Sequence, residues 1–344
     1  MLGQHMFIVL LGLLLAGCKD DNSKAVIEDA ISGDTVPKEE VPNSPSTSSS
    51  SELMPNPIEP DLLGNLIDIK ISIPGGAPSV VPANSKLKLR ITGFYDNGTV
   101  DLTDAVDLRI LDDTSNITLT EDNQIQAGIY NAAGAYYNET WIEAEFGDIK
   151  TQLKVKVIEG VCEAMLTRAQ VEALGGACVM SYTYDGKEYL YTPGKKFMDE
   201  LGYTASNIEE NEGRTYARIH EVNSYALFRR DGKGMTWANF TQDKNPYGQA
   251  ERFCNDLAEM EFNKKANWQM ATSEDLTELI NHHKNNGLID SDEGLPFYFS
   301  IWSDERFVNN WGAYVYLIDK KAGKIGVKSG TVLSSVTAVI CRSS

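Results

Sequence analysis

Five cysteines are the side chains whose type and spacing most directly indicate chemistry in this chain. Cys18 ends an apolar N-terminal run, which leaves four others: Cys162, Cys178, Cys254 and Cys341. In an exported chain, an even remainder predicts two disulfides, and four cysteines allow three pairings. We favour a local bond, Cys162–Cys178, and a long one, Cys254–Cys341, that closes a whole domain. Such a loop stabilises a fold by roughly 4–5 kcal/mol; four reduced, buried thiols are the alternative.

Histidines and carboxylates form no recognisable catalytic or metal-binding set. His282 and His283 are adjacent, so on a helix they point about 100° apart and do not converge on one ion. We interpret them as a helix end with His283 partly packed. The sequence has no Gly-rich phosphate loop, Gly-x-Ser-x-Gly elbow or His-Glu-x-x-His pair. We therefore expect no enzyme, no cofactor and no metal, and assign helix capping and solvation to four acidic residues: Glu259, Glu261, Glu274 and Asp275.

The composition restricts the classes of partner. The chain has 344 residues with 42% hydrophobic side chains, enough for two domains and a tail. Acidic residues number 49 against 31 basic ones, and the formal net charge is −18. Such a surface repels phosphate backbones, so we expect no nucleic-acid partner.

An apolar stretch of signal-peptide length opens the chain. Residues 6–15 are too few to span a bilayer of about 30 Å as a helix. The stretch ends in Leu15-Ala16-Gly17-Cys18, which resembles the bacterial lipobox. The resemblance implies a signal peptide over residues 1–17, cleavage before Cys18, and acyl chains on Cys18 that anchor the protein to a membrane. Lys19 is compatible with sorting to the outer membrane, and an ordinary cleaved signal is the alternative.

Residues 18–62 are poor in apolar side chains and rich in Ser, Thr and Pro, as in the run NSPSTSSSS at 43–51. Such a composition cannot fill a core, which predicts a disordered tether. About forty flexible residues have a root-mean-square reach of roughly 35 Å. We therefore expect the tether to hold the folded part of the chain away from a membrane.

Residues 63–159 change to a period of two. Apolar residues alternate with polar ones around Ile67–Ile73, Leu87–Ile91 and Leu153–Val157, and the turn Asp96-Asn97-Gly98 interrupts the pattern. This pattern predicts short antiparallel strands, each with one buried face, in an all-β sandwich.

Three sequence segments here resemble bacterial immunoglobulin-like domains of group 2: GFYDNGTVDLT at 93–103, NQIQA at 123–127 and WIEA at 141–144. The resemblance implies a stalk module of the kind found in surface adhesins such as invasins and intimins. We expect Phe94 and Trp141 to be core residues rather than a ligand platform. Five aspartates are scattered without a compact calcium-loop spacing, so we assign turn-forming and solvated roles to Asp96, Asp101, Asp104, Asp112 and Asp113.

Residues 160–344 mix helical and strand patterns. We predict short helices at 167–174, with Thr167 as N-cap, and at 197–201, and a hairpin turning at Asp185-Gly186. A longer helix starts at Tyr247 and turns Cys254 inward, and a second starts at Thr272 and ends near Gly287. Strands are predicted at 225–228, 297–302, 313–317 and 336–341.

This order resembles the C-type lectin-like fold, in the bacterial variety of intimin and invasin tips and Lcl-type domains. The resemblance rests on RFC at 252–254, NWQMAT at 267–272, IWS at 301–303, WGAY at 311–314 and VICR at 339–342. It implies an α+β domain with Cys254 and Cys341 in structural positions. The calcium-chelating triplets of sugar-binding lectins are absent, so the resemblance implies protein binding or calcium-free glycan binding.

We expect flat aromatic surface near the domain end to contact the ligand. Phe307, Trp311, Tyr314 and Tyr316 are the aromatic candidates, half of them core, and Trp302 is expected in the core. The ligand-binding residues predicted from the sequence are Phe307, Asn309, Asn310 and Trp311. The whole pattern favours a lipid-anchored adhesin or recognition lipoprotein on the outer membrane of a Gram-negative bacterium, facing the cell surface. The alternative is an accessory lipoprotein that docks a secretion or conjugation apparatus in the periplasm.

Overall fold

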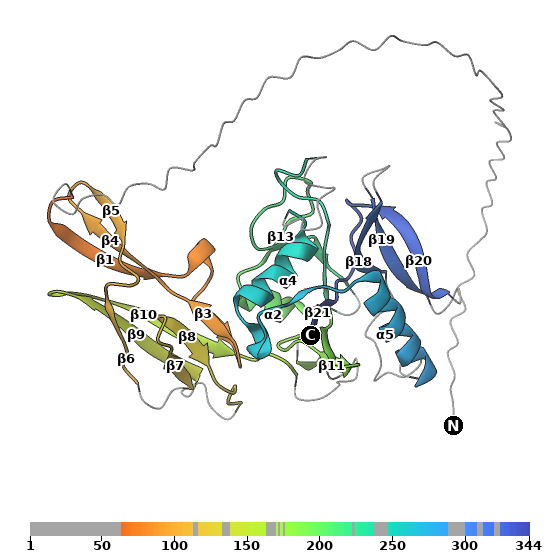
Figure 1. Ribbon diagram of the computed structural model, residues 1–344, viewed down its shortest axis with the longest axis horizontal. Helices are drawn as coiled ribbons and strands as arrows, with labels where there is room; N and C mark the ends of the chain where they lie inside the picture. The colour runs from red at the N-terminus through yellow and green to blue at the C-terminus, as the bar shows by residue number, and fades with distance from the viewer. Residues whose placement is uncertain are drawn as a thin grey trace, which may run out of the picture. The chain divides into compact units, whose positions relative to one another are not determined.

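A computed structural model (Figure 1) describes residues 63–112, 116–132, 138–162, 170, 173–174, 176–221, 224–236, 247–287, 300–307, 312–319 and 324–344. These residues belong to one compact unit, residues 57–344. The described fold is rich in β-strands and has few helices. Within the described part of the chain, no helix has the length and apolarity needed to cross a membrane.

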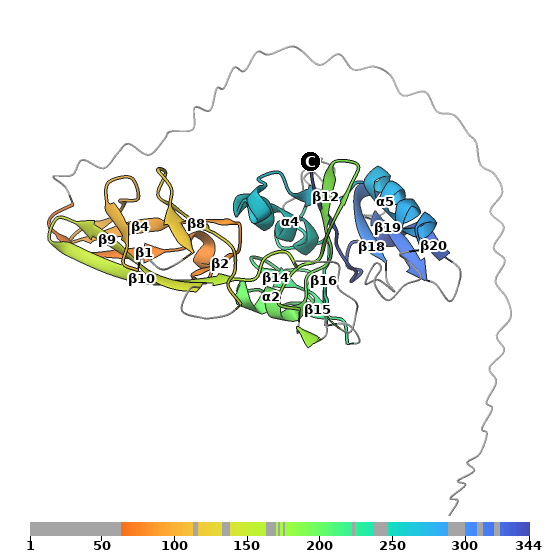
Figure 2. The same cartoon turned by 90° about the horizontal axis from the view of Figure 1, so that it is seen from below.

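Residues 66–158, here called the β region, form three sheets around one apolar core. Figures 1 and 2 show the sheet of β1, β4 and β5 facing the sheet that contains β10, β9 and β6. The strand orders are β1-β4-β5, β2-β10-β9-β6 and β3-β8-β7. The strands are β1 (Leu66–Ser72), β2 (Val80–Pro82), β3 (Lys86–Lys88), β4 (Arg90–Tyr95), β5 (Gly98–Asp101), β6 (Asp107–Ile110), β7 (Ile117–Leu119), β8 (Gln124–Ala127), β9 (Glu139–Phe146) and β10 (Ile149–Ile158), with a short turn η2 (Pro74–Gly76).

The predicted alternation is present in β1 with one exception. Ile69, Ile71 and Ile73 are buried, but 63% of Ile67 is exposed. A register shift between Leu66 and Asp68 in the pairing with β4 causes the difference. A bulge inserts one residue, and one residue of shift moves a side chain to the other face of the sheet.

The alternating segment 86–91 also divides between sheets. Leu87 and Leu89 are buried as predicted, and so is Ile91. Yet β3 pairs with β8, whereas β4 pairs with β1 and β5. One continuous apolar pattern therefore contributes to two sheets that share a core. The predicted turn is confirmed, because Tyr95 pairs with Gly98 across Asp96 and Asn97.

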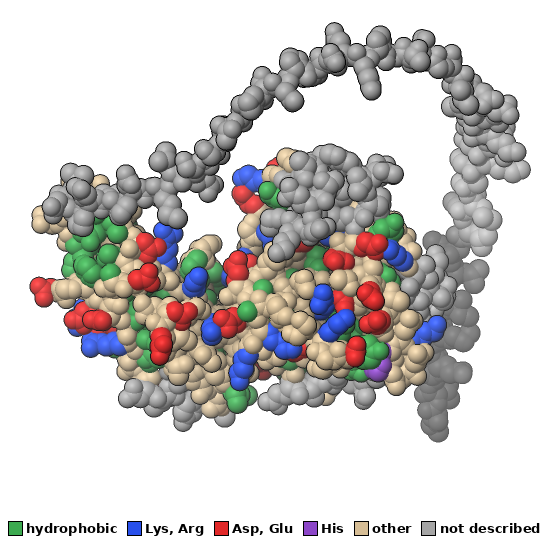
Figure 3. Space-filling view, in the orientation of Figure 1, with side chains coloured by type: hydrophobic (Ala, Val, Ile, Leu, Met, Phe, Trp, Pro, Cys, Tyr) green, Lys and Arg blue, Asp and Glu red, His purple; other side chains and the backbone are tan. Residues whose placement is uncertain are grey.

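Phe94 and Trp141 are not core residues, contrary to the prediction. Their exposed fractions are 37% and 46%. Trp141 lies between Thr140 and Ile142, which are both buried, so the strand period directs Trp141 outward. Figure 3 shows hydrophobic surface over β1, β4 and β5, the sheet that carries exposed Ile67 and Phe94.

Residues 160–344, here called the C-terminal module, contain a four-stranded sheet of order β11-β12-β21-β17. Successive residues of its strands enter different apolar clusters. Leu190 and Cys341 belong to the cluster that contains α4, and Tyr189 and Ile340 belong to the cluster that contains α5. The sheet therefore separates two cores, each with its own helix, because strand side chains alternate between faces. The elements are β11 (Ser181–Tyr184), β12 (Lys187–Leu190), β17 (Gln269–Met270), β21 (Cys341–Ser343), α2 (Lys195–Glu200), α4 (Gln249–Glu259) and α5 (Ser273–Asn285).

Local signals placed several of these elements correctly. The β11–β12 hairpin turns at Asp185-Gly186, both with positive φ, which is the backbone of a type I′ turn. The α5 helix begins with a capping box in which Thr272 and Asp275 satisfy each other's backbone N–H groups. The predicted helix at 167–174 lies mostly outside the described residues.

A second sheet has the order β18-β19-β20, with β18 (Ile301–Phe307), β19 (Gly312–Asp319) and β20 (Lys324–Val332). Sequence reasoning missed β20, which among the described strands pairs with β19 alone and whose residues include two glycines and two lysines. The predicted strand at 336–341 is mostly irregular: Thr337 and Ala338 make single bridges, and β21 begins only at Cys341. Short ladders complete the module: β13 (Thr204–Ala205) with β14 (Thr215–Tyr216), and β15 (Arg218–Ile219) with β16 (Ala226–Leu227).

Backbone hydrogen bonds join the β region to the C-terminal module at a contact here called the joint (residues 84–86 and 260–264). The Lys86 amide donates to the Met260 carbonyl at 2.7 Å, and the Lys264 amide donates to the Asn84 carbonyl at 2.8 Å. Four non-glycine residues at this joint have left-handed φ values. Such a backbone conformation costs free energy, and the hydrogen bonds across the joint offset this cost. The four residues are Asn84, Glu261, Asn263 and Lys264, the last two within the turn η4 (Phe262–Lys264).

Candidate functional site

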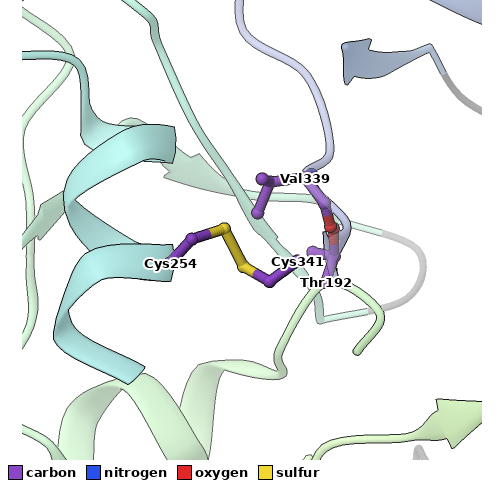
Figure 4. The surroundings of a disulfide bond; sticks show 4 residues. All are labelled: Thr192, Cys254, Val339 and Cys341. Atoms are coloured by element: carbon purple, nitrogen blue, oxygen red, sulfur yellow. A yellow bond between two sulfur atoms is a disulfide. The ribbon is translucent and has the colours of Figure 1, made fainter. Parts of the chain in front are cut away.

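The Cys254–Cys341 disulfide joins α4 to the last strand of the chain. Helical periodicity places Cys254 on the buried face of α4, and both sulfur-bearing residues are almost fully buried. Figure 4 shows Thr192 beside the bond: its hydroxyl donates to the Val339 carbonyl at 2.7 Å and accepts from the Val339 amide at 2.9 Å. Residues 192, 254, 339 and 341 are thus held together, although they are far apart in the sequence.

The second disulfide joins Cys162 to Cys178, and these two bonds are those of the favoured pairing. Val161 and Val179 form a parallel bridge beside it, and the Cys162 amide donates to the Val179 carbonyl at 3.0 Å. The bond therefore lies where the chain enters the C-terminal module. Cys18, the predicted lipidation site, lies outside the described residues.

The predicted ligand residues lie at the end of β18 and after it. Phe307 is the last residue of β18 and pairs with Gly312 of β19, while Asn309, Asn310 and Trp311 lie outside the described residues, as does the side chain of Phe307. The two strands that flank the candidate segment are therefore fixed in one antiparallel pair.

A bulge in β18 (residues 303–305) lies immediately before this strand end. Trp302 pairs with Val315, whereas Arg306 pairs with Ala313, so β18 has two extra residues at this position. Arg230, which is 1% exposed, donates from its guanidinium to the carbonyls of the bulge at 2.5, 3.2 and 3.4 Å. Carbonyl groups in a bulge do not form the regular hydrogen bonds between strands, and buried carbonyls need a hydrogen-bond donor. The Arg230 guanidinium supplies these donors.

Glu251 on α4 holds this arginine in place. Its carboxylate lies 2.8 Å from Arg230 Nε and 2.7 Å from Nη2. The disulfide-bearing helix is therefore linked through one ion pair to the strand that precedes the candidate ligand residues. Sequence reasoning missed Arg230 and Glu251, since nothing in their local spacing indicates that they meet.

Of the aromatic candidates on β19, one contributes surface and one contributes core. Tyr314 is half-buried and carries the Lys328 ammonium 4.0 Å from its ring centre, a cation–π contact. Tyr316 is buried and its hydroxyl donates to the Ser273 carbonyl at 2.9 Å, so it is not a contact residue. Trp302 is fully buried, as predicted, and its indole N–H donates to the Phe228 carbonyl at 2.9 Å.

The acidic residues have structural partners. Glu259 and Glu274 are exposed, as expected, and Glu261 pairs with Lys86 at 2.9 Å. Asp275 caps α5, as predicted, but it is only 2% exposed, so the predicted solvation is wrong for this residue. In the β region, the Asp96 carboxylate accepts from the Asn65 amide and Asp101 accepts from the Thr103 amide, both at 3.0 Å; the hydrogen bonds from Thr103 lower the pKa of Asp101. Asp113 lies outside the described residues.

His282 and His283 are each hydrogen-bonded to a tyrosine. Tyr182 Oη lies 2.9 Å from His282 Nε2, and Tyr191 Oη lies 2.8 Å from His283 Nε2. His283 is completely buried rather than partly packed. Within the described ranges, no group of three or more His, Cys, Asp or Glu residues is arranged to hold a metal ion.

Comparison with protein-family models finds no match, and neither does comparison with curated proteins.

Proposed function

We propose that this protein is a lipid-anchored recognition lipoprotein, an adhesin of the Gram-negative outer membrane, that binds a protein or glycan ligand through its C-terminal module. The proposal takes the β region as an immunoglobulin-like spacer and the C-terminal module as a C-type lectin-like head. One observation carries it: a disulfide joins the first long helix to the final strand of the chain. That strand belongs to a sheet that has a helix on each face.

The surroundings of β18 and β19 support a binding role. The described charged residues there hold elements together: Arg230 and Glu251 fix the bulge, and Lys328 pairs with Glu305. These contacts hold the ends of β18 and β19 in place. A binding surface that is already ordered before binding loses less conformational entropy when the ligand binds. The proposal assigns ligand contact to the aromatic and amide side chains at the end of β18 and after it: Phe307, Asn309, Asn310 and Trp311.

The anchor is tested by fractionation. Cys18→Ser removes the thiol that would receive acyl chains, so the protein is expected to move from the membrane fraction to the aqueous one. As a control, cells that express the parent chain are treated with an inhibitor of lipoprotein processing of the globomycin type and fractionated in the same way. Unchanged membrane partitioning of Cys18→Ser would contradict the anchor.

Exposure is tested by treating intact cells with a protease. Loss of the C-terminal module from whole cells supports the adhesin. Protection of the module, together with recovery of an envelope complex by pull-down, favours the accessory lipoprotein of a periplasmic machine instead.

The binding residues are tested on protein and glycan arrays with residues 63–344, with and without calcium. Trp311→Ala is expected to weaken binding at least tenfold, the scale of an aromatic hot spot. Trp141→Ala is the matched control, since it removes an exposed tryptophan from the β region. Equal loss in both variants, or no ligand on either array, argues against the proposed head.

A further inference from the structure

Two tyrosine–histidine pairs connect the last turns of α5 to the β11–β12 hairpin. Tyr182 on β11 binds His282, and Tyr191, directly after β12, binds His283. The ring of Tyr182 also packs on His283, with 4.6 Å between ring centres. Both pairs join residues about 100 positions apart, so this cluster connects the end of α5 to the hairpin.

The buried surroundings of His283 favour the neutral form of its imidazole ring. The residue is 0% exposed, and its Nδ1 has no hydrogen-bond partner among the described atoms. A neutral imidazole has one N–H and one acceptor nitrogen, whereas the cation has two N–H groups. Protonation would therefore bury a positive charge beside a donor that lacks an acceptor, which is strongly unfavourable.

The surrounding groups do not compensate for that charge. Tyr182 and Tyr191 face His283 from the hairpin, and His282 faces it from its own helix. Burial first, and the charge of His282 second, lower the pKa of His283 to about 4. Four nearby ionisable groups on the hairpin, α5 and the adjacent strands bind elsewhere: Lys187 and Asp275 bind each other, Glu305 binds Ser273 and Lys328, and Tyr316 binds Ser273.

We propose that Tyr182, Tyr191, His282 and His283 form an acid-sensitive latch, which is closed at neutral pH and releases the C-terminal turns of α5 from the hairpin in acid. The release is local. At its N-terminal end, α5 is held by Asp275, whose carboxylate stays ionised in mild acid because hydrogen bonds from Lys187 and Thr272 overcome the effect of burial and lower its pKa. The Cys254–Cys341 bond keeps β21 in place. Acid therefore frees one end of a helix whose other end stays attached.

The sign and size of the effect follow from linkage. In the open state His283 regains a pKa near 6.5, so the open state binds more protons between pH 6.5 and 4. The closed state is thus fully favoured above about pH 6.5 and loses its advantage as the pH falls toward 4. The opening constant is expected to rise about twenty-fold from pH 7 to pH 5.

The test is amide hydrogen exchange on the full chain carrying Cys18→Ser, between pH 7 and pH 4.5, corrected for the intrinsic pH dependence of exchange. Amides of residues 281–286 and of the β11–β12 hairpin are expected to open about twenty-fold more at pH 5, while residues 276–279 change little. His283→Gln removes the titrating group and is expected to abolish the pH dependence. His282→Gln, the matched control on the half-buried neighbour, is expected to retain it.

Two measurements keep the test decisive if His283→Gln does not fold. Tyr191→Phe removes a hydrogen bond without removing the titrating ring, so opening should increase at every pH with the dependence kept. An NMR titration of the parent protein should give His283 a pKa well below 6. A value near 6.5, or acid opening that survives in His283→Gln, overturns the latch. Neither readout needs a ligand, so they hold or fail separately from the proposed function.

Discussion

Asp275 shows how one buried carboxylate connects three elements. It accepts hydrogen bonds from the Thr272 amide and hydroxyl at the start of α5 and from Lys187 on β12 at 2.7 Å. It also forms an ion pair with Arg342 on β21, with 2.7 Å between Arg342 Nε and the carboxylate. Burial alone would raise its pKa, but the hydrogen bonds from Lys187 and Thr272 and the charge of Arg342 leave the pKa of Asp275 lowered. The residue is thus both a helix cap and an ionic tie between α5 and the sheet.

Asp275→Asn should lower the free energy of unfolding by about 2–4 kcal/mol, because it leaves two cations without their shared partner. The carboxylate's contribution is present above about pH 4 and lost as the pH falls below the usual value of 3.8, since its folded-state pKa is depressed. Urea unfolding at pH 7 and pH 3 measures both effects. Glu274→Gln, an exposed change one residue away, should cost under about 0.5 kcal/mol. Equal stability of the two variants at pH 7 would show that the tie contributes nothing.

At the scale of elements, the sheet β11-β12-β21-β17 is stabilised by long-range contacts. The final strand β21 pairs with β12 and β17, and α4 binds it covalently. Because the sheet lies between two apolar clusters, loss of β21 would expose one face of each. The long disulfide therefore secures the strand on which both cores depend.

The two disulfides should differ in their contribution to stability. Loop-closure entropy gives roughly 4–5 kcal/mol for the loop of 87 residues and about 3 kcal/mol for the loop of 16. The double variant Cys254→Ala with Cys341→Ala should therefore unfold at lower denaturant than the matched pair Cys162→Ala with Cys178→Ala. Chemical unfolding monitored by tryptophan fluorescence compares them. The reverse order would mean that the short bond holds the module together.

At the scale of the whole described unit, contacts at the joint and beside it connect the β region to the C-terminal module. Besides the two backbone bonds, the Lys86 ammonium pairs with Glu261, and Lys156 pairs with Glu200 at 3.3 Å. Gly202 has φ +78 and comes so near Pro78 that a Cβ atom there would lie 2.6 Å from the proline Cδ. We expect residues 63–344 to unfold in one transition.

Gly202→Ala tests this contact. Gly147 also has a positive φ, +60, but has open space around it. Both alanine variants pay the left-handed strain of about 1 kcal/mol, and only Gly202→Ala adds the clash with Pro78. Calorimetry should therefore show a larger loss for Gly202→Ala, by about 1–2 kcal/mol, with the transition broadened or split. Identical losses in the two variants would indicate that the Gly202–Pro78 contact does not couple the β region to the C-terminal module.

Local sequence signals determined the elements that depend on neighbours in the chain. The Asp185-Gly186 turn, the Thr272–Asp275 capping box and the inward face of α4 follow from backbone preferences and helical period alone. The sequence also pointed to the two cysteine pairs, since one was local and the other would close a domain. These features require no knowledge of which strands meet.

Only the tertiary structure decided features that depend on distant partners. A bulge turned Ile67 outward, and the packing of the sheets left Phe94 and Trp141 exposed on the faces away from the core. The bulge in β18 is satisfied by Arg230, about 75 residues away, and His283 is buried by a hairpin about 90 residues away. Burial of a polar or aromatic side chain depends on what packs against it, and sequence periodicity specifies a face of an element but not its neighbour.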